Sequence, residues 1–417
     1  MLILGIETSC DETAAALVRF DRGRFDIISN IVSSQVKIHS KYGGIVPEVA
    51  ARNHVVNIIP VVEQALEEFK GEVTIKRLKE TRPSASSHSG LRASGPRTAG
   101  SVENKKQETK GANDLIDAIA VTNGPGLITS LLVGVETAKA LAYAWDKPLI
   151  AINHLEGHIY SVMKIRDYEN MKINDFNFPA LALIVSGGHT QLVLMTDYGR
   201  YRIIGETRDD AAGEAFDKVA KLLGLGYPGG PVIAVKADEC QKIGNKKQDL
   251  RQAQILSKTR NKDTKKLQIT SSKYQINLPR PMIDSKDFDF SFSGLKTAVL
   301  YETRNKKQEI RNKKLGKKYI SKMCAEFQQA VIDVLTAKTL KAAKKYKVKN
   351  VILAGGVSAN KSLRERFKKE FGNKLLLPGP GLSTDNAVMI AMAGVRHFRE
   401  RNFIELNKIK VDPNLTL

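Results

Sequence analysis

Two histidines four residues apart, His154 and His158, are the residues of this chain that most directly indicate chemistry. On a helix, residues four apart lie on one face, so both imidazoles can bind the same metal ion. Glu156 lies midway between them and not directly after the first histidine, which is not the zinc-protease arrangement. The pair therefore indicates a metal site of another kind, or two ordinary histidines of one helix.

A third ligand is available at Asp385, at the expected start of the last clear helix. That carboxylate can bind a metal, or it can serve only as a helix cap. Two histidines and one carboxylate with open positions form a ligand set that suits Fe(II), with Zn, Mn or Mg as alternatives. We therefore expect one divalent metal per chain.

Two acids, Asp11 and Glu12, lie at the tip of the first expected hairpin, between the apolar strands Leu2–Glu7 and Ala14–Arg19. Acids at such a junction can orient a metal, a water molecule or a nucleophile. The alternative for Asp11 is the ordinary role of a turn former.

Two glycine turns, Ser186–Thr190 and Ala354–Val357, follow expected strands. Glycine allows a close approach of the backbone, so successive N–H groups can point at a phosphate. The second turn leads into a helix, whose N-terminus favours anions. Either turn can also be a plain tight turn, and Asn360 can contact a base or ribose or simply cap the helix.

A segment dense in acids, Asp209–Lys218, precedes the glycine-containing segment Tyr227–Pro231. One interpretation places Asp217 and Gly230 in a cleft, against a ribose or an acyl group. The other is a solvated helix followed by a turn.

The elements that must position these residues form a pattern that occurs twice. A strand, a polar turn and a strand open the chain, and the same order recurs with Ala180–Val185 and Gln191–Thr196. Helices are expected at Val46–Phe69, Leu127–Trp145, from near Asn153, from Lys361 and at Asn386–Arg399. Two such halves predict a duplicated, two-lobed α/β nucleotide-binding fold, with ligands beyond the carboxyl ends of the strands.

Composition limits the function classes. The chain has 417 residues and a net charge of +22, and 42% of its residues are hydrophobic, which excludes wholesale disorder and favours a polyanionic partner. No apolar run approaches the roughly 18 residues of a membrane span. The three cysteines are far apart, which favours a reduced compartment. The first residues enter a strand directly and do not form a targeting segment, so we expect a cytoplasmic protein without a membrane partner.

Nearly all of this charge lies in the segments 71–113, 241–275 and 303–318, which carry +5, +8 and +7. Each contains an Asn-Lys-Lys-Gln-acid string, at Asn104–Glu108, Asn245–Asp249 and Asn305–Glu309. We interpret them as polar loop insertions, with an auxiliary RNA-binding role as the alternative.

The expected division of the chain is a first lobe at 1–150, a second lobe at 151–399, and a segment from about 400 to 417 that returns to the first lobe.

Taken together and in order, the motifs resemble one family closely. They are Ile6–Thr13, Asn123–Gly126, His154–His158, Ser186–Thr190, Asp209–Lys218, Phe290–Lys296, Gly355–Val357 and Thr384–Asn386. The chain resembles the TsaD family, the catalytic subunit of the tRNA N6-threonylcarbamoyladenosine synthase. The resemblance covers nearly everything outside the three basic segments.

The resemblance implies the fold of the actin, hexokinase and heat-shock ATPase superfamily. It implies transfer of a threonylcarbamoyl group from threonylcarbamoyl-AMP to N6 of adenosine 37, in tRNAs that read codons beginning with adenine. Leu-Glu-Gly between the histidines is similar to bacterial and mitochondrial members. Bacterial members work with a TsaB-like paralogue and a TsaE-like ATPase, and a separate synthase makes the adenylate.

The resemblance also implies roles by position. His154, His158 and Asp385 would bind the metal, and Asp11 and Glu12 would be needed for transfer. The residues that would hold the adenylate are Val185, Ser186, Gly187, Gly188, His189, Asp217, Gly230 and Asn360. A small-molecule kinase or a non-catalytic scaffold is the competing interpretation, and neither has an obvious use for the three ligands.

Overall fold

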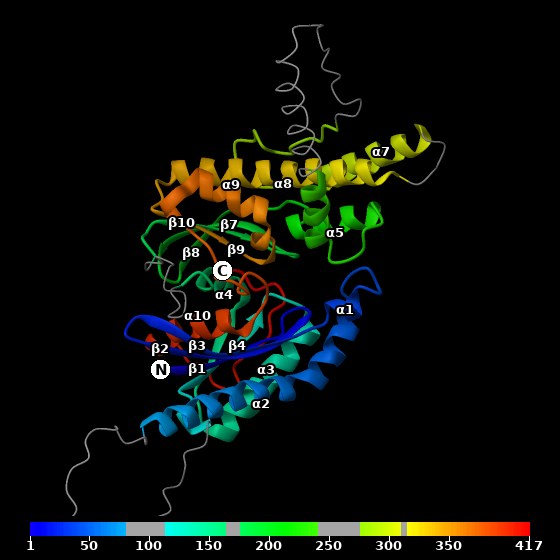
Figure 1. The fold of residues 1–417 in the computed structure, drawn as a ribbon. Coiled ribbons are helices and arrows are strands. Elements are labelled where there is room, and N and C mark those ends of the chain that lie inside the picture. Colours follow the sequence, from blue (N-terminus) through cyan, green and yellow to red (C-terminus); the bar gives the residue numbers. More distant parts are fainter. Residues whose placement is uncertain (81–112, 164–175, 241–275, 310–314) are drawn as a thin grey trace, which may run out of the picture.

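A computed structural model describes residues 1–80, 113–163, 176–240, 276–309 and 315–417. Within these ranges the chain forms two five-stranded sheets with helices packed on their faces (Figure 1). Both sheets are mixed, and in each of them strands alternate with helices along the chain after an opening meander. This is the α/β architecture that the sequence predicts.

The first sheet has the order β3-β2-β1-β4-β5. Its strands are β1 (Leu2–Glu7), β2 (Glu12–Asp21), β3 (Arg24–Ser34), β4 (Ala118–Gly124) and β5 (Leu149–Asn153). The meander β1 to β3 is antiparallel, and β4 and β5 join it in parallel. Every residue of β1 is buried, because helices cover both faces of the sheet.

The second sheet repeats this order, as β8-β7-β6-β9-β10. Its strands are β6 (Ala180–Val185), β7 (Thr190–Asp197), β8 (Arg200–Glu206), β9 (Asn350–Ala354) and β10 (Leu375–Leu376). The antiparallel meander and the two parallel additions are the same as in the first sheet. The identical topology confirms the duplication predicted from the repeated strand–turn–strand pattern.

Helices cover each sheet on both faces. On the outer face of the first sheet lie α2 (Pro47–Glu80) and α3 (Ile128–Trp145). The outer face of the second sheet is covered by α5 (Ala212–Leu222), α7 (Ser293–Glu309), α8 (Lys317–Lys345) and α9 (Lys361–Phe371). A short α1 (Val36–His39) follows β3, and residues 229–240 are also helical.

Two helices lie between the sheets, α4 (His154–Tyr160) and α10 (Ala387–Arg399) (Figure 1). Leu155 and Ile159 of α4 pack on the inner face of the second sheet, in one cluster with Ala182 and Ile184. Helix α10 packs on the inner face of the first sheet and also contacts α4. The region between the lobes is therefore built from elements of both halves.

The position of α10 corrects the expected lobe division. The sequence prediction ends the second lobe at 399, whereas α10 contacts β1, β2, β4 and β5 of the first sheet. The approach is close, because a Cβ on Gly5 would lie 2.3 Å from the carbonyl oxygen of Ala387. The return to the first sheet thus begins at Ala387 and not at about 400, and Ile404 continues it by pairing with Leu149.

The predicted loop insertions are only partly described. Residues 71–80 continue α2, residues 303–309 end α7, and 317–318 begin α8, so the loop prediction is wrong at these positions. Lysine, arginine, glutamine and glutamate are good helix formers, and propensity outweighs the missing apolar period there. The segment 241–275 and residues 81–112 lie outside the described residues.

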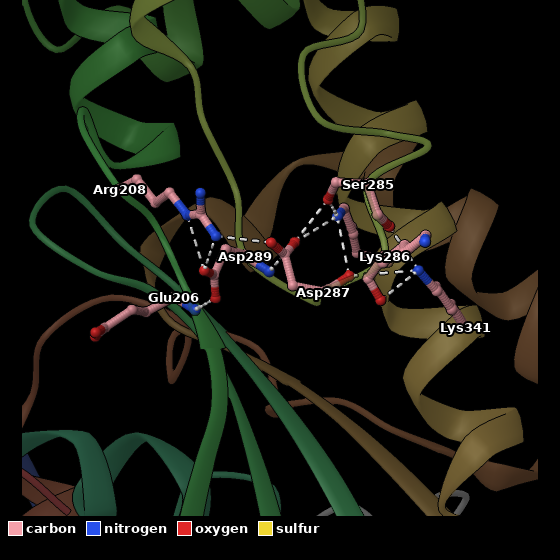
Figure 2. Close-up of polar contacts among 8 residues, drawn as sticks. Glu206, Arg208, Ser285, Lys286, Asp287, Asp289 and Lys341 are labelled. Atoms are coloured by element: carbon pink, nitrogen blue, oxygen red, sulfur yellow. Dashed lines mark hydrogen bonds and ion pairs between the residues drawn. The ribbon is translucent and has the colours of Figure 1, made fainter.

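A polar brace joins β8 to α8 through the segment that precedes α7 (Figure 2). Arg208 donates to Asp287 Oδ2 at 2.7 Å and to Asp289 Oδ2 at 2.9 Å. The fully buried Lys338 donates to the Ser285 hydroxyl and, at 3.1 Å, to the carbonyl of Asp287. A buried ammonium needs such acceptors, so the brace fixes the segment leading into Phe290.

The acid-dense segment meets the Phe-Ser-Phe-Ser-Gly motif at Asp209. Its carboxylate accepts from the hydroxyls of Ser291 and Ser293, at 2.5 and 2.6 Å, and from Phe292 N at 2.8 Å. Burial raises the pKa of Asp209, but these hydrogen bonds outweigh it and hold the pKa below its usual value. Asp209 is therefore a structural residue that starts α7.

Candidate metal centre and interlobe site

His154, His158 and Asp385 come together between the lobes. Asp385 Oδ1 lies 3.2 Å from His158 Nε2 and 3.5 Å from His154 Nε2. One ligand atom from each residue falls within 4.8 Å of the other two. The two imidazoles are nearly perpendicular, with ring centroids 4.7 Å apart. The three residues that the sequence proposed as one ligand set thus converge on one point.

Helix caps on both sides explain how these side chains are placed. The Asn153 side chain accepts from Leu155 N at 2.8 Å and starts α4, which puts His154 and His158 on one helix face. Asn386 accepts from Met389 N at 3.1 Å and starts α10. The capping residue is therefore Asn386, and the Asp385 carboxylate remains available for the histidines.

The chemistry of the donor set fits a divalent metal. His158 is fully buried; its Nδ1 has no hydrogen-bond partner among the described residues, and its Nε2 lies 3.2 Å from Asp385 Oδ1. An unpaired buried imidazole is costly unless its nitrogen binds something else. Two imidazoles and a carboxylate suit Fe(II), Zn or Mn better than Mg, which prefers oxygen ligands alone.

The electrostatics of the group agree with this interpretation. Burial raises the pKa of Asp385, but the His154 charge and hydrogen bond outweigh burial and hold that pKa well below its usual value. For His154, burial lowers the pKa, while the Asp385 and Glu7 carboxylates raise it well above the ordinary value. The site therefore keeps its carboxylate ionised and ready to bind a cation.

The glutamate between the histidines faces away from them. Glu156 accepts from the Tyr201 hydroxyl at 2.7 Å, and its other oxygen lies 3.0 Å from His397 Nε2. Residues two apart on a helix point to different sides, so Glu156 is directed away from the group formed by His154, His158 and Asp385, called the metal group below. A glutamate placed there cannot activate a metal-bound water, which agrees with the rejection of a zinc-protease motif.

The turn after β6 brings His189 close to the metal group. Ser186 N donates to the His189 carbonyl at 2.8 Å, and His189 N donates to the Ser186 hydroxyl at 3.2 Å. Burial, followed by the charges of His154 and His158, lowers the pKa of His189 to about 4. A neutral imidazole is therefore presented toward the ligand set.

The other residues of this turn divide into an open part and a core part. Gly187 and Gly188 are exposed, with open space where a Cβ would stand. The Val185 side chain is fully buried in the core of the second lobe, so only its backbone lies at the turn. That backbone packs on the second glycine turn, since a Cβ on Gly355 would lie 2.5 Å from Val185 O and φ there is +87°.

Asn360 serves as the cap of α9. Its Oδ1 accepts from Leu363 N at 3.0 Å, and its Nδ2 donates to Gln328 Oε1 at 2.8 Å. Both ends of the amide thus have partners within the protein. A contact between Asn360 and an adenylate stays a prediction.

Asp217 contacts the residue that precedes Gly230, and a contact of either with a ribose or an acyl group stays a prediction. Asp217 Oδ1 accepts from Gly229 N at 2.6 Å, and Gly230 follows at the start of the helical residues 229–240, with open space at its Cβ position. Burial raises the pKa of Asp217, and the charge of Asp11 raises it further. The charge of Asp11, from the first lobe, thus acts on Asp217 in the second.

Asp11 and Glu12 form a carboxyl pair at the start of β2. Burial, followed by the charge of Asp11, raises the pKa of Glu12 to about 10. Asp11 is buried. Burial is the larger cause of the raised pKa values of the Cys10 thiol and the Tyr227 hydroxyl, and the charge of Asp11 is the second cause. At neutral pH, Glu12 is thus the protonated member of the pair.

Replacing Glu12 by glutamine is expected to stabilise the protein at neutral and alkaline pH. The folded pKa of about 10 exceeds the unfolded value of 4.5, so the stability linked to this proton is complete below pH 4.5 and is lost as pH rises through 10. Glutamine is neutral throughout, so Glu12→Gln should gain about 1 to 3 kcal/mol of unfolding free energy at pH 8.

Urea denaturation of both proteins at pH 5 and pH 8 measures this difference. The gain should be small at pH 5 and large at pH 8. A difference that does not change with pH would contradict the assignment of a protonated Glu12.

One site residue was missed by sequence reasoning. Glu7, fully buried at the end of β1, lies 3.0 Å from His154 Nδ1. The signal was present in the sequence, since a carboxylate ends an otherwise apolar strand, Leu2–Glu7. Buried carboxylates of this kind are rare unless paired.

The repeated five-stranded unit, with a His-His-Asp group between its two copies, defines a two-lobed, duplicated α/β protein with a candidate metal site between the lobes. A sequence profile of TsaD, tRNA N6-adenosine threonylcarbamoyltransferase, matches residues 26–79, 97–259 and 232–392. The chain belongs to this family.

Curated relatives carry the same description. The tRNA N6-adenosine threonylcarbamoyltransferase of Syntrophomonas wolfei is 44% identical over 97% of this chain and 95% of its own length. That of Bacillus subtilis is 42% identical over 96% and 91%. Among solved structures, an activator of 2-hydroxyisocaproyl-CoA dehydratase from Clostridium difficile with bound ADPNP aligns over 100% of both chains, at 13% identity and a TM-score of 0.41.

Within the described residues, no helix combines the length and the hydropathy that a membrane span requires.

Proposed function

We propose that this chain transfers the threonylcarbamoyl group from threonylcarbamoyl-AMP to N6 of adenosine 37, in tRNAs that read codons beginning with adenine. The observation that carries the proposal is the convergence of His154, His158 and Asp385 between two lobes of a TsaD-family chain. The same family membership accounts for the open glycine turn and the carboxyl pair beside this group. AMP is the second product.

The adenylate lies between the lobes, beyond the strand ends. Gly187 and Gly188 face its phosphate, because no side chain fills the space beside them. Asp217 and Gly230 contact the ribose, and Asn360 contacts the nucleoside from the start of α9. These contacts orient the mixed anhydride, which is the main contribution such a site makes to catalysis.

His154, His158 and Asp385 would hold a divalent metal, which would supply Lewis-acid polarisation of the carbamoyl or phosphate oxygen. Fe(II) is the favoured ion, with Zn, Mn or Mg as alternatives. The adenine N6 attacks the carbonyl carbon, a C–N bond forms, and the bond to the phosphate oxygen of AMP breaks. Asp11 accepts the N6 proton, and the protonated carboxyl of Glu12 keeps Asp11 oriented by a hydrogen bond.

The partners follow from this reaction. The substrate tRNA presents adenosine 37 in the anticodon loop, where a base needs little unstacking to enter a pocket. A TsaB-like paralogue and a TsaE-like ATPase assist the chain, and a separate synthase supplies threonylcarbamoyl-AMP. Such a tRNA-modifying reaction takes place in the cytoplasm, as the bacterial relatives suggest.

The test combines the full-length chain with threonylcarbamoyl-AMP and unmodified tRNA, with and without the two protein partners. Nucleoside mass spectrometry then measures threonylcarbamoyladenosine, and AMP release is followed in parallel. A tRNA with guanosine at position 37 is the matched substrate control. Absence of product with every partner supplied would reject the proposal.

A further inference from the structure

Glu7 holds three groups from three different parts of the chain. Its Oε1 accepts from Ser9 N at 2.5 Å, and its Oε2 accepts from the Thr122 hydroxyl at 2.7 Å. The same Oε2 lies 3.0 Å from His154 Nδ1. The side chain has no exposure to solvent, so within the described part of the chain these contacts compensate its buried charge.

These contacts determine which nitrogen of His154 carries the proton when the ring is neutral. A carboxylate only accepts hydrogen bonds, so Nδ1 must be the donor toward Glu7. The Ser9 hydroxyl, 3.1 Å from the same nitrogen, can donate or accept and does not fix the tautomer alone. With the hydrogen on Nδ1, the lone pair is on Nε2, the nitrogen that faces Asp385 at 3.5 Å.

We propose that Glu7 is a positioning residue that locks His154 in the Nδ1–H tautomer and thereby makes Nε2 a metal ligand. Through Ser9 N, the same carboxylate also ties the turn that carries Asp11 and Glu12 to the metal group. A carboxylate behind a ligating histidine orients the ring and raises its basicity. The inference rests on the metal site of the proposed function.

Glu7→Gln separates this role from simple space filling. Glutamine has nearly the same shape but only one acceptor oxygen, and its amide nitrogen must face one of three hydrogen-bond donors. If that nitrogen faces His154, Nδ1 must become an acceptor and the hydrogen moves to Nε2, which blocks metal binding. Thr122→Val is the matched control, because it removes one donor from Glu7 and leaves the carboxylate and His154 unchanged.

The experiment uses the full-length chain with Zn²⁺ as the diamagnetic probe. Competition with a chromophoric chelator gives the affinity, and ¹⁵N spectra of histidine-labelled protein give the protonation of each ring nitrogen. We expect a 10- to 100-fold loss of Zn²⁺ affinity in Glu7→Gln and a change of less than about threefold in Thr122→Val. In the wild type loaded with Zn²⁺, His154 Nδ1 should carry the proton and Nε2 should bind the metal.

The possible outcomes separate the two hypotheses. If wild type and His158→Ala bind Zn²⁺ equally, the metal site itself is wrong and the inference falls with it. If binding depends on His158 but Glu7→Gln binds as tightly as wild type, only the role of Glu7 is overturned. If Glu7→Gln does not fold, the wild-type spectrum decides, and metal binding through Nδ1 of His154 overturns the inference.

Discussion

The variant His158→Ala should lose its bound metal and transfer threonylcarbamoyl at least about 100-fold more slowly than the wild type. Lewis-acid polarisation is worth several kcal/mol in the transition state, and each 1.4 kcal/mol corresponds to a factor of ten. The polar contact that the structure gives the His158 ring is to Asp385 Oδ1 at 3.2 Å, within the ligand set itself, so its removal disturbs the proposed metal site and not a hydrogen bond elsewhere among the described residues. The measurements are metal content by elemental analysis and the initial rate of nucleoside modification.

His397→Ala provides the matched control for this prediction. His397 is also near α4, but it pairs with Glu156 on the face away from the metal group. This variant should keep its metal and most of its activity. A His158→Ala protein that retained stoichiometric metal and a wild-type rate would contradict the metal centre.

Asp11→Asn is the second change with a large expected effect, a loss of about 10²- to 10⁴-fold in the transfer rate. Asparagine preserves the size of the side chain but cannot accept the proton that N6 releases. Asparagine removes a carboxyl group from a site that binds an anionic adenylate, so the variant should hold the adenylate at least as well as the wild type. Single-turnover rates at saturating tRNA, with separate binding of a non-hydrolysable adenylate, distinguish chemistry from binding.

The control for Asp11→Asn is Asp146→Asn at the end of α3. Asp146 has φ of 50°, a left-handed conformation that asparagine adopts readily, and it lies after the helix on the outer face of the first lobe. Its replacement should leave the rate unchanged. Equal rates for Asp11→Asn and wild type would remove Asp11 from the proton-transfer step.

Local sequence was sufficient to predict features whose pattern lies within one helix or occurs once in each half of the chain. The spacing of His154 and His158 predicted a helix face, and Asn153 starts that helix as expected. The repeated strand–turn–strand pattern predicted the duplication, because each half buries its strands by the same alternation of elements. The wide separation of the three cysteines and the distribution of charge along the chain are also read directly from the sequence.

Predictions failed where packing or propensity competes with position in the chain. Helix α10 was assigned to the second lobe by its place in the sequence, yet its apolar face packs on the first sheet. The basic segment from 303 was expected to be a loop, but strong helix formers extend α7 through it. Hydrophobic periodicity predicts neither the sheet on which α10 packs nor the extension of α7. It identifies the apolar face of a helix but not the element that covers this face.

The sequence by itself determined the ligand types, the duplicated fold and the family to which the chain belongs. Only the tertiary structure decided which residues act together. Glu7 and His154 are 147 positions apart, and Asp385 reaches both histidines only because α10 returns to the first sheet beside α4. A hydrogen bond or a shared metal depends on distances of a few ångströms, and chain folding sets those distances after local spacing has set each element.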